Sequence, residues 1–257
     1  TNALNVSKIG SGDLTLSGLN TATGTLTIGQ GNVILSGAAG SSAFAPTLNT
    51  GGTLTIDNTT YLTNRLQSKN LTMQGGTFVL GGNASSAVSE TIGTLTVQNG
   101  GGVITLSGGA GGAELLTITT LTAQAITSGG SLLLRGASLG SAAGANVANA
   151  TVATLTGVTG VTQGTGANLT TTMLIRPDII ADASVSGSGT GFLTKDSSTG
   201  FLRPLATAEL ATSLTSSPTT NFGNFSAVQG YSVATSVNSL TINTANGITV
   251  SGAGQSG

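Results

Sequence analysis

Hydrophobic and polar residues alternate along short segments of the chain, and these segments recur. The sequence GTLTIGQGNVILSG occupies residues 24–37, and a close relative, GTLTVQNGGGVITLSG, occupies 93–108. Leucine or isoleucine alternates with threonine in each, and successive side chains of a β-strand point to opposite faces. The pattern predicts strands with one apolar face, joined by turns in which glycine adopts the positive φ of a sharp corner.

The apolar–threonine–apolar core returns at varying intervals along the chain. A unit of two strands with one apolar face cannot bury that face alone, whereas stacked parallel units bury it between neighbours. No segment shows the i, i+3, i+4 spacing of an amphipathic helix. We therefore predict an all-β fold, a parallel β-solenoid with irregular rungs. An antiparallel sandwich is the alternative, and it explains the near-identical segments less well. Further copies of the core lie at 13–18, 53–58, 71–82, 115–122, 131–136 and 240–252.

The apolar residues of these strands share one face, so they are predicted to form columns that fill the interior of the solenoid. The predicted interior residues are Leu14, Leu16, Leu26, Ile28, Val33, Leu35, Leu54, Ile56, Leu71, Met73, Phe78, Leu80, Leu95, Val97, Ile104, Leu106, Leu132, Leu134, Leu240, Ile242, Ile248 and Val250.

The regularity of the pattern divides the chain into three parts. Residues 1–136 are predicted to form regular rungs, 137–236 atypical rungs with a long irregular excursion, and 237–257 a return of the solenoid pattern. The excursion also contains most of the aromatic residues, which we expect to seal a small satellite core. These phenylalanines are Phe192, Phe201, Phe222 and Phe225.

Charge is scarce. Charged residues are 6% of the chain and the net charge is −1, while the mean hydropathy is +0.31, which excludes the composition of a disordered protein. A nearly neutral surface of Thr, Ser and Asn repels a second copy only weakly and favours association. The seven basic residues are scattered, so no nucleic-acid partner is expected.

Three further features of the sequence concern its cysteine content, the length of its apolar runs and its first residues. No cysteine is present, so neither a disulfide framework nor a thiolate metal site is expected. No apolar run has the length of a membrane-spanning helix. The chain opens TNALNVSKIG, without an initiator methionine or a signal peptide, and we interpret it as a section of something longer.

The segment SGDLTLSGLNTATGTLTIGQGNVILSG (11–37) resembles the autotransporter-associated β-strand repeat. SLLLRGASLGSAAG (131–144) and GTGFLTKDSSTGFLRPL (189–205) resemble a segment, ending in Arg-Pro-Leu, of long proteins with these repeats. The resemblance implies right-handed β-helical shafts in large exported proteins at the bacterial cell surface, and no catalytic residues. The matching positions are Gly12, Leu14, Thr15, Leu16, Ser17, Gly18, Asn20, Thr21, Thr23 and Gly24.

Candidate catalytic chemistry is sparse. Histidine is absent, which removes Ser-His and Cys-His mechanisms, and neither a P-loop nor a calcium-binding repeat occurs. Glycosidases need two carboxyl groups, and Asp178 and Asp182 beside Arg176 are the best candidate pair. A salt bridge in a loop explains these residues more simply. We therefore predict no catalytic, cofactor-binding or metal-binding residues.

Threonine pairs suggest one further possibility. Thr25/Thr27, Thr53/Thr55 and Thr94/Thr96 would form a periodic array on a solenoid face, as in some ice-binding proteins. Threonine also simply suits the outward face of a strand.

The sequence as a whole predicts an extracellular structural protein: a shaft, filament or surface layer. Open rungs at each end would expose unpaired backbone, so association with further copies, end to end or laterally, is expected. The alternatives are an adhesin whose 137–236 excursion binds a cell-surface glycan, and a polysaccharide-active enzyme, which needs two acids in one groove.

Overall fold

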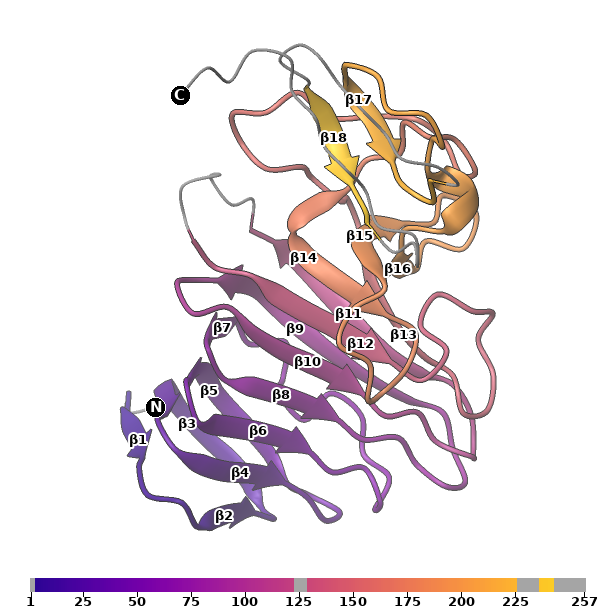
Figure 1. The fold of residues 1–257 in the computed structure, drawn as a ribbon. Coiled ribbons are helices and arrows are strands. Elements are labelled where there is room, and N and C mark those ends of the chain that lie inside the picture. The colour runs from indigo at the N-terminus through magenta and orange to yellow at the C-terminus, as the bar shows by residue number, and fades with distance from the viewer. Residues whose placement is uncertain (1–2, 123–128, 226–235, 243–257) are drawn as a thin grey trace.

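The computed structural model describes residues 3–122, 129–225 and 236–242, and these residues form an all-β protein with almost no helix (Figure 1). One short 3₁₀-helix, η1 (Thr207–Glu209), lies near the C-terminal end. None of the helical structure in the described part of the chain is long and apolar enough to cross a membrane.

From β1 to β14, consecutive strands alternate between two sheets, and each strand pairs in parallel with the next strand of its own sheet. We call strands β1 to β14 the parallel stack. This arrangement is compatible with a β-solenoid, because the chain adds one strand to each sheet before it returns to the first. The first sheet contains β1 (Val6–Lys8), β3 (Leu19–Ile28), β5 (Ser41–Asn49), β7 (Leu71–Gln74), β9 (Val88–Val97), β11 (Glu114–Leu121) and β13 (Ala148–Val152). The second sheet begins with β2 (Asp13–Leu16), β4 (Gly31–Leu35), β6 (Gly52–Ile56), β8 (Thr77–Leu80), β10 (Gly102–Leu106), β12 (Leu132–Gly136) and β14 (Arg176–Asp182).

The strand pairs are in register although the loops between them differ in length. In the second sheet, one inward-facing column advances by 19 residues at its first step, from 14 to 33, and by 47 residues at its last, from 134 to 181. The extra residues therefore lie in the loops, and apolar residues of successive strands still stack on one another. The column consists of Leu14, Val33, Leu54, Phe78, Ile104, Leu134 and Ala181.

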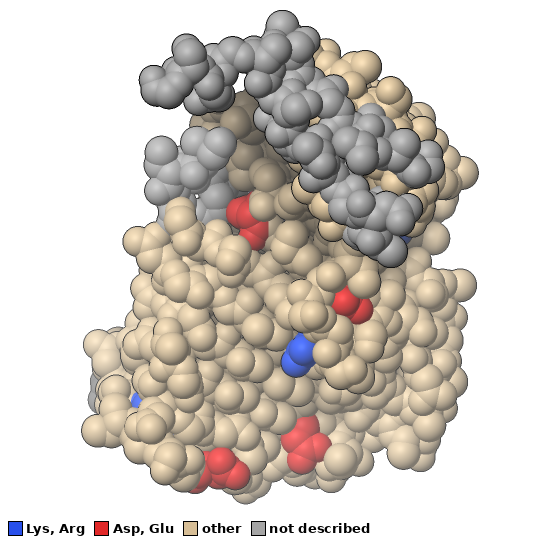
Figure 2. All heavy atoms as spheres, viewed as in Figure 1, with Lys and Arg blue, Asp and Glu red and all other residues tan. Residues whose placement is uncertain are grey.

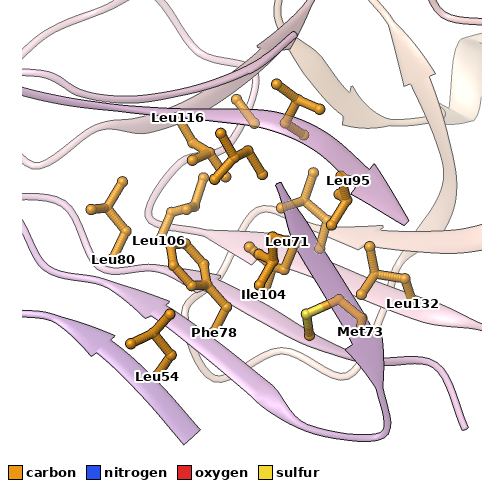
Figure 3. Packing of buried hydrophobic residues seen from close by; sticks show 14 of the residues in the cluster. Leu54, Leu71, Met73, Phe78, Leu80, Leu95, Ile104, Leu106, Leu116 and Leu132 are labelled. Carbon is orange, nitrogen blue, oxygen red and sulfur yellow. The ribbon is translucent and has the colours of Figure 1, made fainter. Parts of the chain in front are cut away.

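The interior between the two sheets is apolar (Figure 3). Every predicted interior residue from Leu26 to Leu134 is buried, and Leu54, Phe78 and Ile104 are completely inaccessible to solvent. Leu14 and Leu16 are only half-buried, because β2 is the last strand of its sheet and no further strand covers them.

The prediction of interior residues is wrong at the C-terminal end of the described chain. Leu240 is half-buried and Ile242 is 56% exposed. These residues belong to or follow β18 (Val237–Leu240), which pairs only with β17 (Ser217–Phe222) in a separate two-stranded sheet. The column inside the stack therefore does not continue through them. Ile248 and Val250 lie outside the described residues.

The parallel stack extends past residue 136 and then ends in antiparallel strands. β14 pairs in parallel with β12 on one side and antiparallel with β15 (Gly191–Lys195) on the other, and β15 pairs antiparallel with β16 (Leu202–Pro204). We call β15 and β16 the cap hairpin. Its short outer strand contains Pro204, and proline and short length both discourage pairing at a sheet edge. The expectation of an open rung is therefore wrong at this end of the stack.

The cap hairpin also covers the last strand of the first sheet. Thr151 of β13 pairs antiparallel with Phe201, and its hydroxyl donates to the Gly200 carbonyl at 2.8 Å. The Lys195 ammonium donates to the carbonyls of Val152 and Ala153 at 2.7 and 2.8 Å. The parallel strand pairing of both sheets thus stops at the cap hairpin, where the side chains of Thr151 and Lys195 bind backbone carbonyls.

A small second core lies beside the cap hairpin, as expected for the excursion, but it is mainly aliphatic. Met173, Ile175, Leu205 and Leu210 are buried together, and Phe192 packs partly buried against them. Of the other phenylalanines predicted for this core, Phe222 and Phe225 are buried outside this cluster and Phe201 is half-buried.

Candidate functional site

Polar and charged side chains gather at an internal corner of the parallel stack and in a pocket beside the cap hairpin. At the corner, the Arg65 guanidinium is completely buried. It donates to the carbonyls of Gly37, Gly40 and Thr60 at 2.9, 2.7 and 2.7 Å, and to Asn58 Oδ1 at 2.8 Å. Arg65 thereby satisfies three carbonyls from two loops, 36–40 and 57–70, that no strand pairing reaches.

Glu90 lies inside the same corner, one strand further along the stack. Its carboxylate accepts from the backbone N–H groups of Arg65 and Leu66 at 2.8 and 2.9 Å, and no part of the residue is exposed. Burial raises the pKa of Glu90 to about 7, although these hydrogen bonds and the Arg65 charge act in the opposite direction.

Glu114 is the third buried ionisable residue of the stack. Its Oε2 accepts from the Gly108 N–H at 3.1 Å, whereas Oε1 has no hydrogen-bond partner among the described residues. Burial raises the pKa of Glu114 to about 8, against the hydrogen bonds from Gly108 and Ser107. The carboxyl group is therefore largely protonated at neutral pH, which lowers the cost of burying it.

Glu90 and Glu114 are not among the residues predicted to be buried, although their positions in the strands indicate burial. Glu90 stands between Val88 and Ile92 at an inward-facing position, and Glu114 occupies the inward-facing position before Leu116. A carboxyl group at an inward position of an alternating strand indicates a polar contact inside the fold. The loop carbonyls and N–H groups that meet these side chains are known only from the tertiary structure.

A pocket of about 780 Å³ lies beside the cap hairpin, and Arg203 is its most connected residue. The guanidinium binds both Glu209 oxygens, at 2.6 and 2.8 Å, and Asp196 Oδ2 at 3.1 Å. The Glu209 oxygens also accept from the N–H groups of Ala206 and Leu169 at 2.8 and 3.1 Å. The network joins β16, η1 and the turn that follows β15 to the loop at 168–169.

This network brings two acids into one groove, as an enzyme would require, but both are held ionised. Burial tends to raise the pKa of Glu209, yet hydrogen bonds from Arg203, Ala206 and Leu169 lower it. Burial likewise opposes the hydrogen bonds from Ser198 and Thr199 that hold the pKa of Asp196 well below its usual range. A glycosidase needs one carboxyl group with a raised pKa as its general acid, and neither residue has one.

The predicted acid pair does not converge. Asp178 binds the buried Arg176 guanidinium at 2.6 Å, whereas Asp182 accepts from the N–H groups of Ser184 and Gly189 at 2.9 Å each. The two acids are four positions apart on β14, which is about 13 Å along a strand. They stabilise local structure, although Arg176 and Asp178 lie in a strand and not in the predicted loop.

The predicted threonine pairs divide between the two sheets. Thr25/Thr27 and Thr94/Thr96 lie on β3 and β9 of the first sheet, whereas Thr53/Thr55 lies on β6 of the second. The three pairs therefore do not form one array, and a different set of threonines aligns on the first sheet.

Charged groups are widely separated on the face of the molecule viewed in Figure 2. Within the described ranges, no three His, Cys, Asp or Glu side chains come together in a way that could hold a metal ion. No family model, curated protein or solved structure matches this chain.

Proposed function

We propose that this chain is a structural section of a right-handed β-solenoid in an extracellular protein of the bacterial surface, where it forms part of a shaft or filament. The observation that carries the proposal is the in-register parallel pairing of β1 to β14 around one continuous apolar interior. Such a stack resists bending and extension because every strand is hydrogen-bonded along the long axis. The assignment to a bacterial surface rests on the resemblance of residues 11–37 to autotransporter-associated repeats.

The two ends of the stack differ, and this difference restricts the expected self-association. The cap hairpin covers the last strands of both sheets. β1 and β2 each have a strand on one side only, and the apolar side chains of Val6, Leu14 and Leu16 remain half-buried. The edge formed by β1 and β2 is therefore the surface that takes a further β-rung, whether from the same polypeptide or from a second copy.

The proposal is tested by sedimentation and electron microscopy of the purified chain over a range of concentrations. We expect elongated particles that associate through the β1/β2 edge. Leu14→Lys places a charge at this edge and abolishes association, whereas Thr21→Lys, at an exposed position of β3, leaves it unchanged. A compact monomer at every concentration contradicts self-association, and equal loss in both variants contradicts the assignment of the edge.

The pocket beside the cap hairpin favours a second function, an adhesin that binds a neutral glycan. Asn168, Thr190 and Thr207 line it, and Leu169 beside them is 73% exposed. Hydroxyl and amide groups can hydrogen-bond sugar hydroxyls without charge. Binding of neutral oligosaccharides that is lost in Thr207→Arg and retained in Thr21→Lys supports this function, and the absence of binding by the native chain contradicts it.

A further inference from the structure

Threonines from successive strands of the first sheet form one continuous column on its outer face. Thr27 lies beside Thr47, Thr47 beside Thr72, and Thr72 beside Thr96 in the strand register. Thr122 continues the column, since its hydroxyl lies 3.3 Å from that of Thr96. Loops of different length separate these threonines in the sequence, so their alignment is visible only in the strand register. We call the five residues the threonine column.

Uncharged residues flank the threonine column on both sides, and most of them are polar; the apolar Ala45 lies beside Thr25 in one flank. On one side, Thr94 lies beside Thr120 and its N–H donates to Asn70 Oδ1 at 2.8 Å. On the other side, Gln74 lies beside Asn49 and hydrogen-bonds to Gln98. Within the described chain, no Asp, Glu, Lys or Arg occupies an outward position in the threonine column or in these flanking columns. The result is an uncharged two-dimensional array that consists mainly of hydroxyl and amide groups.

The spacing of the array is fixed by backbone geometry. Neighbouring strands place threonines about 4.8 Å apart, and the next outward residue on the same strand is about 6.6 Å away. A β-branched threonine is restricted to few rotamers, and each hydroxyl can both donate and accept a hydrogen bond. The array therefore presents hydroxyl and methyl groups at repeated positions, which suits a partner that is itself periodic.

Three periodic or extended partners are possible, and the array favours one. It covers about 20 Å by 13 Å, on the order of 300 Å², whereas a stable protein interface buries about 800 Å² per partner. A second copy therefore does not bind stably through this face alone. Sugar rings stack on aromatic side chains, and the outward positions of the described strands in this array carry none. Ordered water needs neither a large apolar area nor an aromatic ring.

We propose that the threonine column and its flanking columns bind the surface of ice. The hydroxyl and amide groups hydrogen-bond to water molecules in lattice positions, and the threonine methyl groups lie between them. The absence of charge matters because an ammonium or carboxylate group holds its own strong hydration shell, which does not fit the lattice. This inference uses the outer face of the first sheet and does not depend on the open edge of β1 and β2.

The test is thermal hysteresis and inhibition of ice recrystallisation by the purified chain. We expect activity in the native chain, complete loss in Thr72→Lys at the centre of the threonine column, and no loss in the matched control Thr77→Lys. Thr77 is a half-buried threonine on β8 of the opposite sheet. Circular dichroism melting of all three proteins shows whether a variant that loses activity is still folded.

Two results overturn the inference: a native chain that does not alter ice growth, or equal loss of activity in folded Thr72→Lys and Thr77→Lys. If Thr72→Lys does not fold, Thr72→Val and Thr72→Ser replace it, and unchanged activity in both also overturns the inference. Sedimentation of the same samples above freezing measures self-association separately, so a failure of one proposal is distinguished from a failure of the other.

Discussion

The parallel stack and the region beside the cap hairpin satisfy their backbone and buried polar groups by different means. In the stack, each backbone is paired by the strands on either side and the interior is filled with aliphatic residues. Every ion pair found in the described residues lies between 176 and 209, in the last strand of the stack, β14, or after it: Arg176–Asp178, Arg203–Asp196 and Arg203–Glu209. Strand pairing satisfies the backbone of the stack without charge, whereas the internal corner at Arg65 and the end of the repeat need charged side chains.

The largest expected effect comes from the apolar column of the stack. Phe78 is completely buried between the sheets, and Phe78→Ala removes most of its side chain and leaves a cavity. We expect the free energy of unfolding to fall by about 3–5 kcal/mol, as measured by denaturant unfolding. Val79→Ala, at the adjacent outward position of β8, should cost far less. Equal losses would show that burial between the sheets does not stabilise the stack.

The next effect is a dependence of stack stability on pH. Burial raises the pKa of Glu90 to about 7 and that of Glu114 to about 8, so the folded state binds protons that the unfolded chain has released. Their stabilising contribution is complete below the unfolded pKa of about 4.3 and is lost as pH rises through about 7 and about 8. We expect a loss on the order of 3 kcal/mol for each of the two acids between about pH 5 and about pH 9.

Glu114→Gln tests the origin of this dependence. The glutamine side chain is neutral at every pH, so unfolding of the variant should depend less on pH than unfolding of the native chain. Asp13→Asn, at an exposed carboxyl group on β2, is the matched control and should retain the native dependence. An unchanged pH profile in Glu114→Gln would exclude Glu114 as a source.

Loss of the Glu209 charge should loosen the region beside the cap hairpin and spare the stack. In Glu209→Gln, the bidentate ion pair with Arg203 is lost, at a cost of about 2 kcal/mol. Hydrogen exchange should therefore accelerate in residues 191–210 and stay unchanged in β4 to β10. Equal acceleration in both parts would show that they unfold as one unit and would remove the distinction between them.

The smallest effect concerns close backbone packing between rungs. A Cβ atom at Gly52 of β6 would lie 2.1 Å from the Ile28 carbonyl oxygen, whereas one at Gly12 meets nothing within 4 Å. Gly52→Ala should destabilise the stack by about 1.5 kcal/mol, and Gly12→Ala should be neutral or slightly stabilising. Thermal unfolding of the two variants checks this pair, and an equal melting temperature would contradict it.

The sequence by itself determined the strands and the direction in which their side chains point. Leu26, Phe78 and Leu134 are buried because alternation is a local property: the pleat of a strand sends every second side chain to the same face. The same local reasoning placed Ile242 inside, and it failed because β18 joins a separate sheet with no interior column beside it.

Only the tertiary structure decided which distant residues meet. The carbonyls bound by Arg65 come from loops up to 28 residues away, and Glu209 reaches Leu169 across 40 residues. The threonine column likewise exists only in the register of stacked strands, since loops of unequal length separate its members. Alternation fixes the face of each residue within a strand, whereas strand pairing and loop length fix its neighbours on other strands.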